Sequence, residues 1–533
     1  MLDEKTLSFL QRELYADPMN YELYLLMGSK LEDQNPYLSC LAYENAEYFC
    51  EVKERVPGDL AQIRQIKKKL CEDRNISIPP VSIIILSYNT LEYTKGCIES
   101  IRRTVKADTC EIIVVENGST DGSREWLETQ SDLKLIVNQE NVGFPAGCNQ
   151  GIKVAKEEND IFLLNSDTVL LLNSLFYLRM GLYRDPQNGT AGSVSNATGN
   201  YQVAMDFPDD LQQLDAYVRK KNLPSAHPCE QKTYLTGFAL LIRREALNKV
   251  GLLDERYSPG YFEDNDYGIR MLEAGYHNVC CWNSFIFHYG SKSFGTDEKR
   301  DELVEHNLNQ FKEKWGFHPW YYTYVREEII KMIQCQTSPL RVLEVGCGFG
   351  ETLGRIQYLY PDAEIHGVEI MENVAAIAKN KLPIMCDNIE TMDLPFDKEY
   401  FDYIIFADVL EHLVSPQTVL KKIHPYLKPN GHVLTSIPNI MNASVIYGLL
   451  HGNFTYQDSG ILDRTHLRFF THKEILKLFA ECGYEIDQLS GTGADCEMTT
   501  DYADFFDQLL QIEGVEDRKF FDVYQYLVSA RKI

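Results

Sequence analysis

Two series of short apolar runs, with helix-like segments between the runs, constrain the fold of this chain more than any other feature. The first series has strand-sized runs at 81–86, 111–115, 133–137, 161–164 and 239–242. The second has runs at 341–345, 365–368, 403–406, 432–436 and 524–530. Strands that alternate with helices are typical of α/β domains with a mostly parallel sheet. The sequence therefore predicts two α/β domains, one for each series.

The segment before the first run has a different pattern. Residues 1–76 show helical spacing without strand alternation, which predicts a short helical hairpin. The pattern faintly resembles one degenerate tetratricopeptide unit, but a single unit cannot bury its own apolar face. We therefore expect a helical N-terminal extension at 1–76 that packs on the next domain. The α/β domains are then expected at 77–318, closing after a polar helix at 297–314, and at 319–533.

Composition disfavours several classes of function. The formal net charge is -26 and the pI is near 4.9, and such an acidic surface disfavours nucleic acid and anionic lipid as partners. The first ten residues lack the apolar core of a signal peptide, and no apolar run approaches the length of a membrane span. The 14 cysteines include no Cys-x-x-Cys pair, which indicates reduced thiols. We expect a cytoplasmic protein.

Polar residues follow the first two strands of the first series, where ligands bind in α/β domains. Ser87, Tyr88 and Asn89 follow the first run, and Glu116 and Asn117 follow the second. A carboxylate at that place can accept a hydrogen bond from a uracil or thymine N–H, or from ribose hydroxyls. Taken alone, the segment equally fits an Asn-Gly turn followed by a helix-capping Ser or Asp.

Together with the segment 141–151, these residues resemble the nucleotide-sugar-binding core of family-2 glycosyltransferases with the GT-A fold, and the likeness extends over roughly 81–316. It implies a donor site made of Ser87, Tyr88, Asn89, Glu116, Asn117, Gly143, Asn149, Asn165 and Asp167. Glu116 stands where the family usually has Asp, and we expect its longer side chain still to reach the base.

The same resemblance places a divalent metal, Mg or Mn, at Asn165 and Asp167, the position of the family's Asp-x-Asp motif. A divalent ion there would neutralise the leaving diphosphate through hard oxygen ligands. Asn165 offers a neutral oxygen in place of the usual carboxylate. His288 stands where related enzymes complete the metal shell, and its alternative is a structural histidine beside aromatic residues.

Inverting sugar transfer also needs a carboxylate base on the acceptor side. By resemblance to the family's Glu-Asp motif, Asp264 is the expected base. Glu263, Asp266 and Arg270 are expected in the acceptor site, with an acid–Arg270 ion pair as the alternative. Acids clustered at a helix start also favour the helix dipole.

A glycine-rich turn follows the first strand of the second series. A Rossmann dinucleotide fingerprint fails there because position 351 is Glu. The acid-x-Gly-x-Gly-x-Gly pattern instead resembles class I methyltransferases, with a Rossmann-like fold over roughly 339–530. Since S-adenosylmethionine is cationic and has no pyrophosphate, an acid beside the turn suits it. The implied cofactor site is Glu344, Gly346, Cys347, Gly348, Gly350, Glu369, Asp387 and Asp408.

Methyl transfer depends mainly on alignment, but an alcohol acceptor also needs a base. His412 and His466 are the candidates, and each has a structural histidine as its alternative. For Asp387, a helix-cap role also remains open.

The combined hypothesis is a bifunctional enzyme that adds a sugar to a glycan or glycoprotein and O-methylates a sugar. The first half most resembles rhamnosyltransferase-like members, which implies dTDP-rhamnose or a UDP-sugar as donor, in surface polysaccharide or flagellin glycan synthesis. One alternative is that only one half is catalytic and the other is a binding or docking module. Another is that the methyltransferase acts on a non-sugar substrate.

Overall fold

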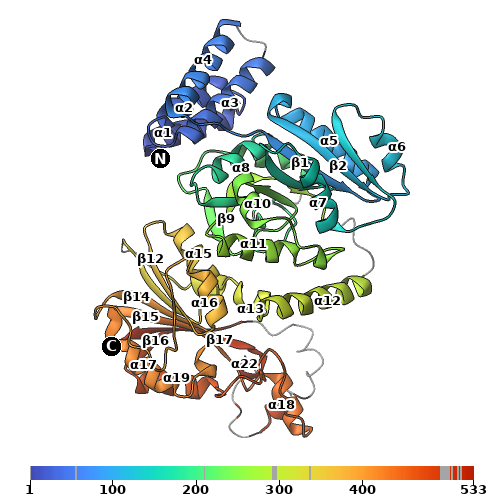
Figure 1. Ribbon diagram of the computed structural model, residues 1–533. Helices are drawn as coiled ribbons and strands as arrows, with labels where there is room; N and C mark the ends of the chain where they lie inside the picture. The colour runs from blue at the N-terminus through green and yellow to red at the C-terminus, as the bar shows by residue number, and fades with distance from the viewer. Residues whose placement is uncertain are drawn as a thin grey trace. The chain divides into compact units, whose positions relative to one another are not determined.

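The computed structural model of the chain describes residues 2–53, 57–208, 210–290, 297–334, 338–492, 505, 508–512, 515 and 519–533. The chain forms two compact units, Met1–Pro319 and Trp320–Ile533 (Figure 1). None of the described helices is both long and apolar enough to cross a membrane.

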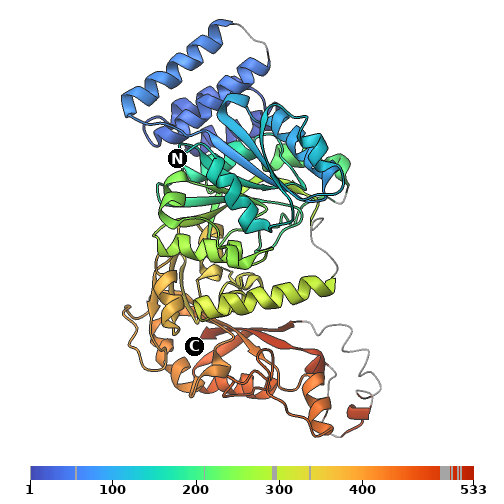
Figure 2. The ribbon, with the colours of Figure 1, turned by 45° about the vertical axis from the view of Figure 1, so that its right-hand side comes forward.

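The N-terminal segment forms four helices where a hairpin was predicted. They are α1 (Glu4–Ala16), α2 (Tyr21–Leu31), α3 (Pro36–Val52) and α4 (Pro57–Arg74), drawn in blue in Figures 1 and 2. The side chain of Asn35 caps α3 by accepting from the Leu38 N–H, and Pro36 occupies its first turn. Fully buried Tyr24 accepts a hydrogen bond from the Asn173 side chain at 2.9 Å. The helices therefore share a core with the α/β part of the unit.

The first unit contains an eight-stranded mixed sheet in the order β3-β2-β1-β4-β8-β6-β9-β7. Its central strands β1, β2 and β4 are parallel, whereas β8 is antiparallel to both β4 and β6. A small antiparallel ladder joins β5 and β10. The strands are β1 (Val81–Ser87), β2 (Cys110–Asn117), β3 (Leu133–Asn138), β4 (Asp160–Asn165), β5 (Thr168–Val169), β6 (Asn188–Val194), β7 (Cys229–Lys232), β8 (Ala239–Ile242), β9 (His277–Phe285) and β10 (Phe287–His288).

Helices cover the faces of this sheet, and α7 lies especially close to it. A Cβ atom at Gly147 would lie 2.3 Å from Leu86, and one at Gly151 would lie 2.5 Å from Ile84. Only glycine permits this approach, which sets the start of α7 beside the carboxyl end of β1. The helices are α5 (Leu91–Thr104), α6 (Ser123–Leu127), α7 (Phe144–Val154), α8 (Ser174–Leu182), α9 (Leu214–Lys221), α10 (Arg244–Val250), α11 (Glu263–Glu273) and α12 (Asp297–Trp315). The short helix α13 (Pro319–Tyr322) contains the boundary between the two units.

The second unit contains a seven-stranded sheet in the order β13-β12-β11-β14-β15-β17-β16. The first five strands are parallel, and β17 runs antiparallel to both β15 and β16. The strands are β11 (Arg341–Val345), β12 (Glu364–Glu369), β13 (Ile384–Cys386), β14 (Phe401–Ala407), β15 (Leu427–Pro438), β16 (Tyr484–Thr492) and β17 (Gln525–Lys532). The helices are α14 (Glu327–Ile330), α15 (Glu351–Leu359), α16 (Glu372–Ala378), α17 (Pro416–Ile423), α18 (Ala443–Leu450), α19 (His472–Glu481) and α22 (Lys519–Asp522).

The predicted fold class, two α/β domains with a helical N-terminal extension, is confirmed. Both sheets are mixed, because antiparallel strands flank a parallel centre in each. The carboxyl ends of the parallel strands carry the candidate sites described next.

Candidate active sites

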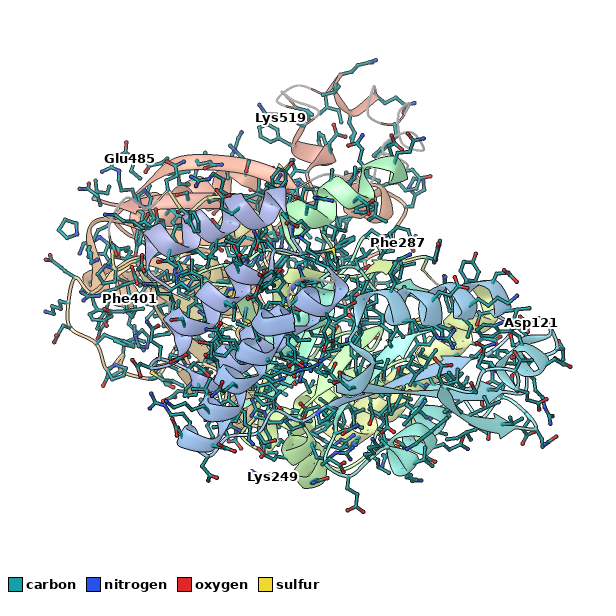
Figure 3. All side chains as sticks on the ribbon, turned by 90° about the horizontal axis from the view of Figure 1, so that it is seen from above. Asp121, Lys249, Phe287, Phe401, Glu485 and Lys519 are labelled. Carbon is teal, nitrogen blue, oxygen red and sulfur yellow. The ribbon has the colours of Figure 1, made fainter. Side chains whose placement is uncertain are left out.

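Side-chain hydrogen bonds join the loops after β1 and β2. The Asn89 backbone N–H donates to Ser119 Oγ at 3.0 Å, and Asn89 Oδ1 accepts from the Thr120 N–H at 2.8 Å. Asp121, labelled in Figure 3, accepts from the Leu91 N–H at 2.8 Å. Asn89 adopts a φ of 52°, a left-handed conformation that asparagine tolerates. The two loops therefore form one fixed rim at the carboxyl edge of the sheet.

The side chains of Ser87 and Tyr88 differ in exposure at this rim. Ser87 is buried, and its hydroxyl lies 3.0 Å from Thr94 Oγ1. Tyr88 is half-buried and Asn89 is exposed. Of the three candidates after β1, Tyr88 and Asn89 are therefore the ones with surface available to a ligand.

Glu116 is buried at the end of β2. Its carboxylate accepts from the Ser119 N–H at 2.6 Å and from the Gly118 N–H at 3.3 Å. Each carboxylate oxygen has more than one lone pair, so these bonds orient the group without exhausting it. The geometry leaves Glu116 able to accept one more donor from a base or a ribose.

Two other donor-site candidates, Asn117 and Asn149, use their amides within the protein. Asn117 donates to Asn141 at 2.7 Å and accepts from the Val142 N–H at 3.2 Å. Buried Asn149 donates to the Leu253 carbonyl oxygen at 2.9 Å and accepts from the Leu253 N–H at 3.0 Å. Both side chains therefore hold loops in place.

Gly143 allows another close contact at the start of α7. Its φ is 86°, and a Cβ atom there would lie 2.6 Å from the Pro259 Cα. The next residue, Phe144, donates its N–H to the Pro259 carbonyl oxygen at 2.8 Å. This contact joins the segment before α7 to the segment that leads into α11.

Asp167 and His288 face each other across the β5–β10 ladder. His288 pairs with Thr168 in that ladder, and its Nε2 lies 3.1 Å from Asp167 Oδ1. Its Nδ1 lies 2.6 Å from the Ala197 carbonyl oxygen, so Nδ1 carries the proton. Burial opposes protonation of the second nitrogen, but the Asp167 carboxylate outweighs it and raises the pKa of His288 above its usual range.

This pair has the geometry of two neighbouring ligands of one divalent ion. Ligand atoms about 2.1 Å from an ion and at right angles to each other lie about 3 Å apart, as these two do. Asn165 lies two residues before Asp167, at the end of β4, and its side chain is half-buried. Without an ion, His288 and Asp167 form a buried ion pair. The donor set thus fits a divalent cation with Asn165 as a third, neutral ligand.

Asp264 begins α11 close to this pair. It is half-buried, and its carboxylate accepts from the Gly237 N–H at 3.1 Å and from the Asn265 N–H at 2.8 Å. The neighbouring Phe238 stacks its ring on His288 and accepts from the Asn165 N–H at 2.8 Å. The Gly237–Phe238 segment, which the sequence analysis did not single out, therefore positions both groups. Burial raises the pKa of Asp264.

The three candidates for the acceptor site have different surroundings. Burial and then the Asp264 charge raise the pKa of Glu263, and its Oε2 has no hydrogen-bond partner among the described residues. Asp266 instead forms ion pairs with Arg270 at 2.8 Å and with Lys314 of α12 at 2.5 Å. The alternative of an acid–Arg270 ion pair is thus realised at Asp266, inside the unit. Trp315 of α12 also donates to Asp266, at 3.0 Å.

The second site begins at the glycine-rich turn after β11. Gly346, Gly348 and Gly350 have φ values of 70°, 53° and 71°. A Cβ atom at Gly348 would lie 2.7 Å from the Tyr322 carbonyl oxygen, which accepts from the Phe349 N–H at 3.0 Å. The turn therefore needs glycine for both its conformation and its close contacts. Cys347, between two of these glycines, is buried.

Two buried carboxyl groups flank this turn. Glu369, at the end of β12, accepts from the Gly348 N–H at 2.8 Å and from the Met371 N–H at 2.9 Å. Glu344 is 3% exposed, and its Oε2 has no partner among the described residues. Burial raises the pKa of Glu344 to about 8. A buried acid with one free carboxyl oxygen beside a glycine turn fits a cationic ligand.

The remaining cofactor candidates also lie at the carboxyl edge of the second sheet. Asp387 is exposed after β13, and its N–H donates to the Glu369 carbonyl oxygen at 3.1 Å. Asp408, after β14, accepts from Ser436 Oγ at 2.7 Å and forms an ion pair with Arg326, which the sequence analysis did not single out. Asp387 can therefore receive a ligand, whereas Asp408 is held by protein groups.

His412 and His466 lie beside each other in the second unit. Their ring centroids are 4.7 Å apart, and buried Glu411 precedes His412 on the short 3-10 helix Leu410–His412. Burial lowers the pKa of His412, and His466 lowers it further. Burial raises the pKa of Glu411 to about 8. The sequence analysis missed Glu411, although it stands next to a candidate base.

The two folds and their sites define a two-domain transferase. The family model described as glycosyl transferase family 2 matches residues 82–251, and one described as a methyltransferase domain matches residues 317–489. The chain is 38% identical over 258 residues to the uncharacterized glycosyltransferase EpsJ of Bacillus subtilis (strain 168), covering 46% of this chain and 71% of that protein. The chain belongs to glycosyl transferase family 2 and carries a methyltransferase domain after the glycosyltransferase domain.

Other similar proteins match parts of the chain. N-acetylglucosaminyl-diphospho-decaprenol L-rhamnosyltransferase of Mycobacterium tuberculosis (strain ATCC 25618 / H37Rv) is 26% identical over 223 residues, covering 37% of this chain and 71% of that protein. The uncharacterized protein y4gI of Sinorhizobium fredii is 26% identical over 264 residues, which cover 45% of this chain and only 28% of that protein. A crystal structure of a SAM-dependent methyltransferase from Archaeoglobus fulgidus is 17% identical, with a TM-score of 0.28, and the match covers 43% of this chain and 94% of that one.

Proposed function

We propose that this chain is a bifunctional enzyme. Its first domain transfers a sugar, with inversion, from a nucleotide-sugar donor to a glycan or glycoprotein acceptor. Its second domain O-methylates a sugar with S-adenosylmethionine. We assign residues 1–76 to a helical extension, 77–318 to the glycosyltransferase and 319–533 to the methyltransferase.

The placement of Asp264 is the observation that carries this proposal. Its carboxylate is held by two backbone N–H groups, close to the segment that also positions His288 and Asn165. A carboxyl group with a raised pKa is a stronger base once it is ionised, so it removes a hydroxyl proton more readily. Inverting transfer requires this step as the bond between the sugar and the phosphate breaks.

Asp167, His288 and Asn165 would hold a divalent metal in the first domain. When bound, Mg or Mn supplies positive charge that neutralises the diphosphate leaving group. The chain's own residues position these ligands. The Ala197 carbonyl oxygen fixes the tautomer of His288, and His288 pairs in the β5–β10 ladder with Thr168, the residue directly after Asp167.

For the second domain, the glycine turn and its two acids support S-adenosylmethionine as the methyl donor. Glu369 would accept hydrogen bonds from ribose hydroxyls, as a carboxylate at the end of a second strand does in related α/β folds. Glu344 would face positive charge, and Asp387 lies at the edge where an adenine would lie. Cationic ligands suit this set of acids, whereas a pyrophosphate does not.

The similarity to a rhamnosyltransferase supports dTDP-rhamnose as donor, with a UDP-sugar as the other candidate. We propose a role in the synthesis of surface polysaccharide or of a flagellin glycan. Two activities in one chain raise the local concentration of a shared glycan if both sites can reach it.

The variant Asp264→Asn tests the glycosyltransferase. Asparagine keeps the size of the side chain but cannot take a proton, so we expect sugar transfer to fall roughly 10²–10⁴-fold. The measurement is transfer from radiolabelled dTDP-rhamnose or UDP-sugars to glycan extracts. Circular dichroism is the control for folding, and S-adenosylhomocysteine binding is the control that the second domain is unaffected. Undiminished transfer by this variant would remove Asp264 from the mechanism.

A further inference from the structure

A second cluster of ligand-type side chains lies at the carboxyl end of β14. Among the residues that the structure describes, Glu411, His412 and His466 are the one group of three His, Cys, Asp or Glu residues whose ligand atoms all lie within 4.8 Å of one another. The loop that carries His466 is fixed on the 3-10 helix, because the Leu467 N–H donates to the Glu411 carbonyl oxygen at 2.8 Å. The two segments that carry the cluster are therefore held together by the backbone of the second unit.

The Glu411 carboxyl group needs a partner that the protein does not supply. The residue is 1% exposed, and neither of its carboxylate oxygens has a hydrogen-bond partner among the described residues. A carboxylate removed from water without a partner is strongly unfavourable. This group therefore requires a proton or a cation, and one of its oxygens lies within 4.8 Å of a ring nitrogen of each histidine.

The hydrogen bonds of both histidines determine which ring nitrogen is free to bind an ion. His412 Nδ1 lies 3.3 Å from the Thr465 carbonyl oxygen and 3.2 Å from Thr465 Oγ1, whose own proton goes to Asp463 at 2.6 Å. His466 Nδ1 lies 3.0 Å from the Ile461 carbonyl oxygen. All these neighbours are acceptors, so each Nδ1 carries the proton and each neutral ring has its lone pair at Nε2.

We propose that Glu411, His412 and His466 bind a divalent transition-metal ion of the zinc or manganese kind in the methyltransferase domain. Two imidazoles and one carboxylate form a ligand set that leaves coordination positions open. Metal-binding histidines donate their other N–H to a carbonyl or a carboxylate, and both rings do so here. The Thr465–Asp463 hydrogen bond extends this support beyond the ligands.

The cluster lies near the glycine turn. Burial, and then the charges of Asp463 and Glu411, raise the pKa of Tyr321, whose ring centroid lies 5.4 Å from that of Tyr322. The Tyr322 carbonyl oxygen in turn accepts from the Phe349 N–H of the turn. If the methyltransferase acts on an alcohol as proposed above, an ion here would supply the charge that helps a hydroxyl lose its proton. The histidines would then be ligands rather than bases.

The test is Co²⁺ binding by the full chain, without any methyl acceptor. The starting protein carries Asp167→Asn and His288→Gln, which remove the candidate ligands of the first domain. We expect one Co²⁺ per chain, detected by its ligand-field absorption and displaced by Zn²⁺. Glu411→Gln and His466→Gln should each weaken binding at least about tenfold, because each removes a ligand. His451→Gln, which changes an exposed histidine of the same unit, should have no effect.

Circular dichroism and S-adenosylhomocysteine calorimetry verify that each variant folds. If either Glu411→Gln or His466→Gln does not fold, the Co²⁺ affinity of the other variant tests the proposed site. Absence of Co²⁺ binding by the starting protein, or unchanged affinity in the folded ligand variant, would overturn the metal site and would show that Glu411 is held as a neutral acid. Loss of S-adenosylhomocysteine binding by the starting protein would instead refute the proposed methyltransferase cofactor.

Discussion

Replacing Glu369 gives the sharpest test of the cofactor site. Its carboxylate holds the Gly348 and Met371 N–H groups at 2.8 and 2.9 Å, and its remaining lone pairs are available to ribose hydroxyls. Glu369→Ala removes these acceptors together. A hydrogen bond to a charged group contributes about 1.5–3 kcal/mol, so loss of even one ribose contact weakens binding at least about tenfold. Loss of support for the turn adds to this effect.

The assay is calorimetric titration of the full chain with S-adenosylhomocysteine. Glu372→Gln is the matched control, because it removes an exposed carboxylate on the first turn of α16, three residues away. We expect the control to bind like the wild type. Affinity of Glu369→Ala within about twofold of the wild type would refute the assignment of Glu369 to the ribose.

Three further predictions concern the other buried charges. Because the pKa of Glu344 is raised to about 8, the folded chain holds a proton that the unfolded chain releases near pH 4.5. Glu344 therefore stabilises the fold at low pH, and this stability is lost as the pH rises toward 8. In urea unfolding at pH 5–8, the free energy of unfolding should fall less steeply with pH for Glu344→Gln than for the wild type. Asp266→Ala removes a buried charged partner of Arg270 and Lys314, although Lys314 keeps Asp254 at 2.8 Å, and should lower the free energy of unfolding by about 1.5–3 kcal/mol in the same assay, whereas Glu273→Ala on the same helix should have a small effect. Chelation, or Asp167→Ala, should abolish donor turnover measured by release of the nucleoside diphosphate, and full turnover in chelator would show that no metal is needed.

The predictable strands were those with continuous apolar runs. Five of the six residues of Val81–Leu86 are apolar, Ser82 being the exception, and the run became the central strand β1. By contrast, β6 consists mostly of small residues and β7 has the sequence Cys-Glu-Gln-Lys, with Glu230 and Lys232 fully buried as an ion pair. Apolar runs cannot reveal such strands, because their buried positions hold small, polar or charged residues.

The site residues also divide into those that the sequence could identify and those that needed the structure. Asp167 and Asp264 could be selected from their positions in motifs, because motifs specify which residue types stand at the strand ends. Whether an amide such as that of Asn149 faces a ligand or a loop depends on its three-dimensional neighbours, here Leu253. Glu411 could not be selected from the sequence for the same reason. Its candidacy as a ligand rests on its buried carboxyl group having no hydrogen-bond partner among the described residues.

The ion pairs of Asp266 with α12 bear on how the glycosyltransferase can be produced alone. The family match ends at residue 251, before the proposed base and before α12. Lys314 and Trp315, at the end of that helix, hold Asp266 two positions from Asp264. Asn307, in its middle, donates to the Tyr257 and Gly260 carbonyl oxygens, just ahead of the same segment. A fragment that ends at residue 251 would lack both the proposed base, Asp264, and the helix α12 that supports its segment. The shortest fragment that keeps both ends after Trp315.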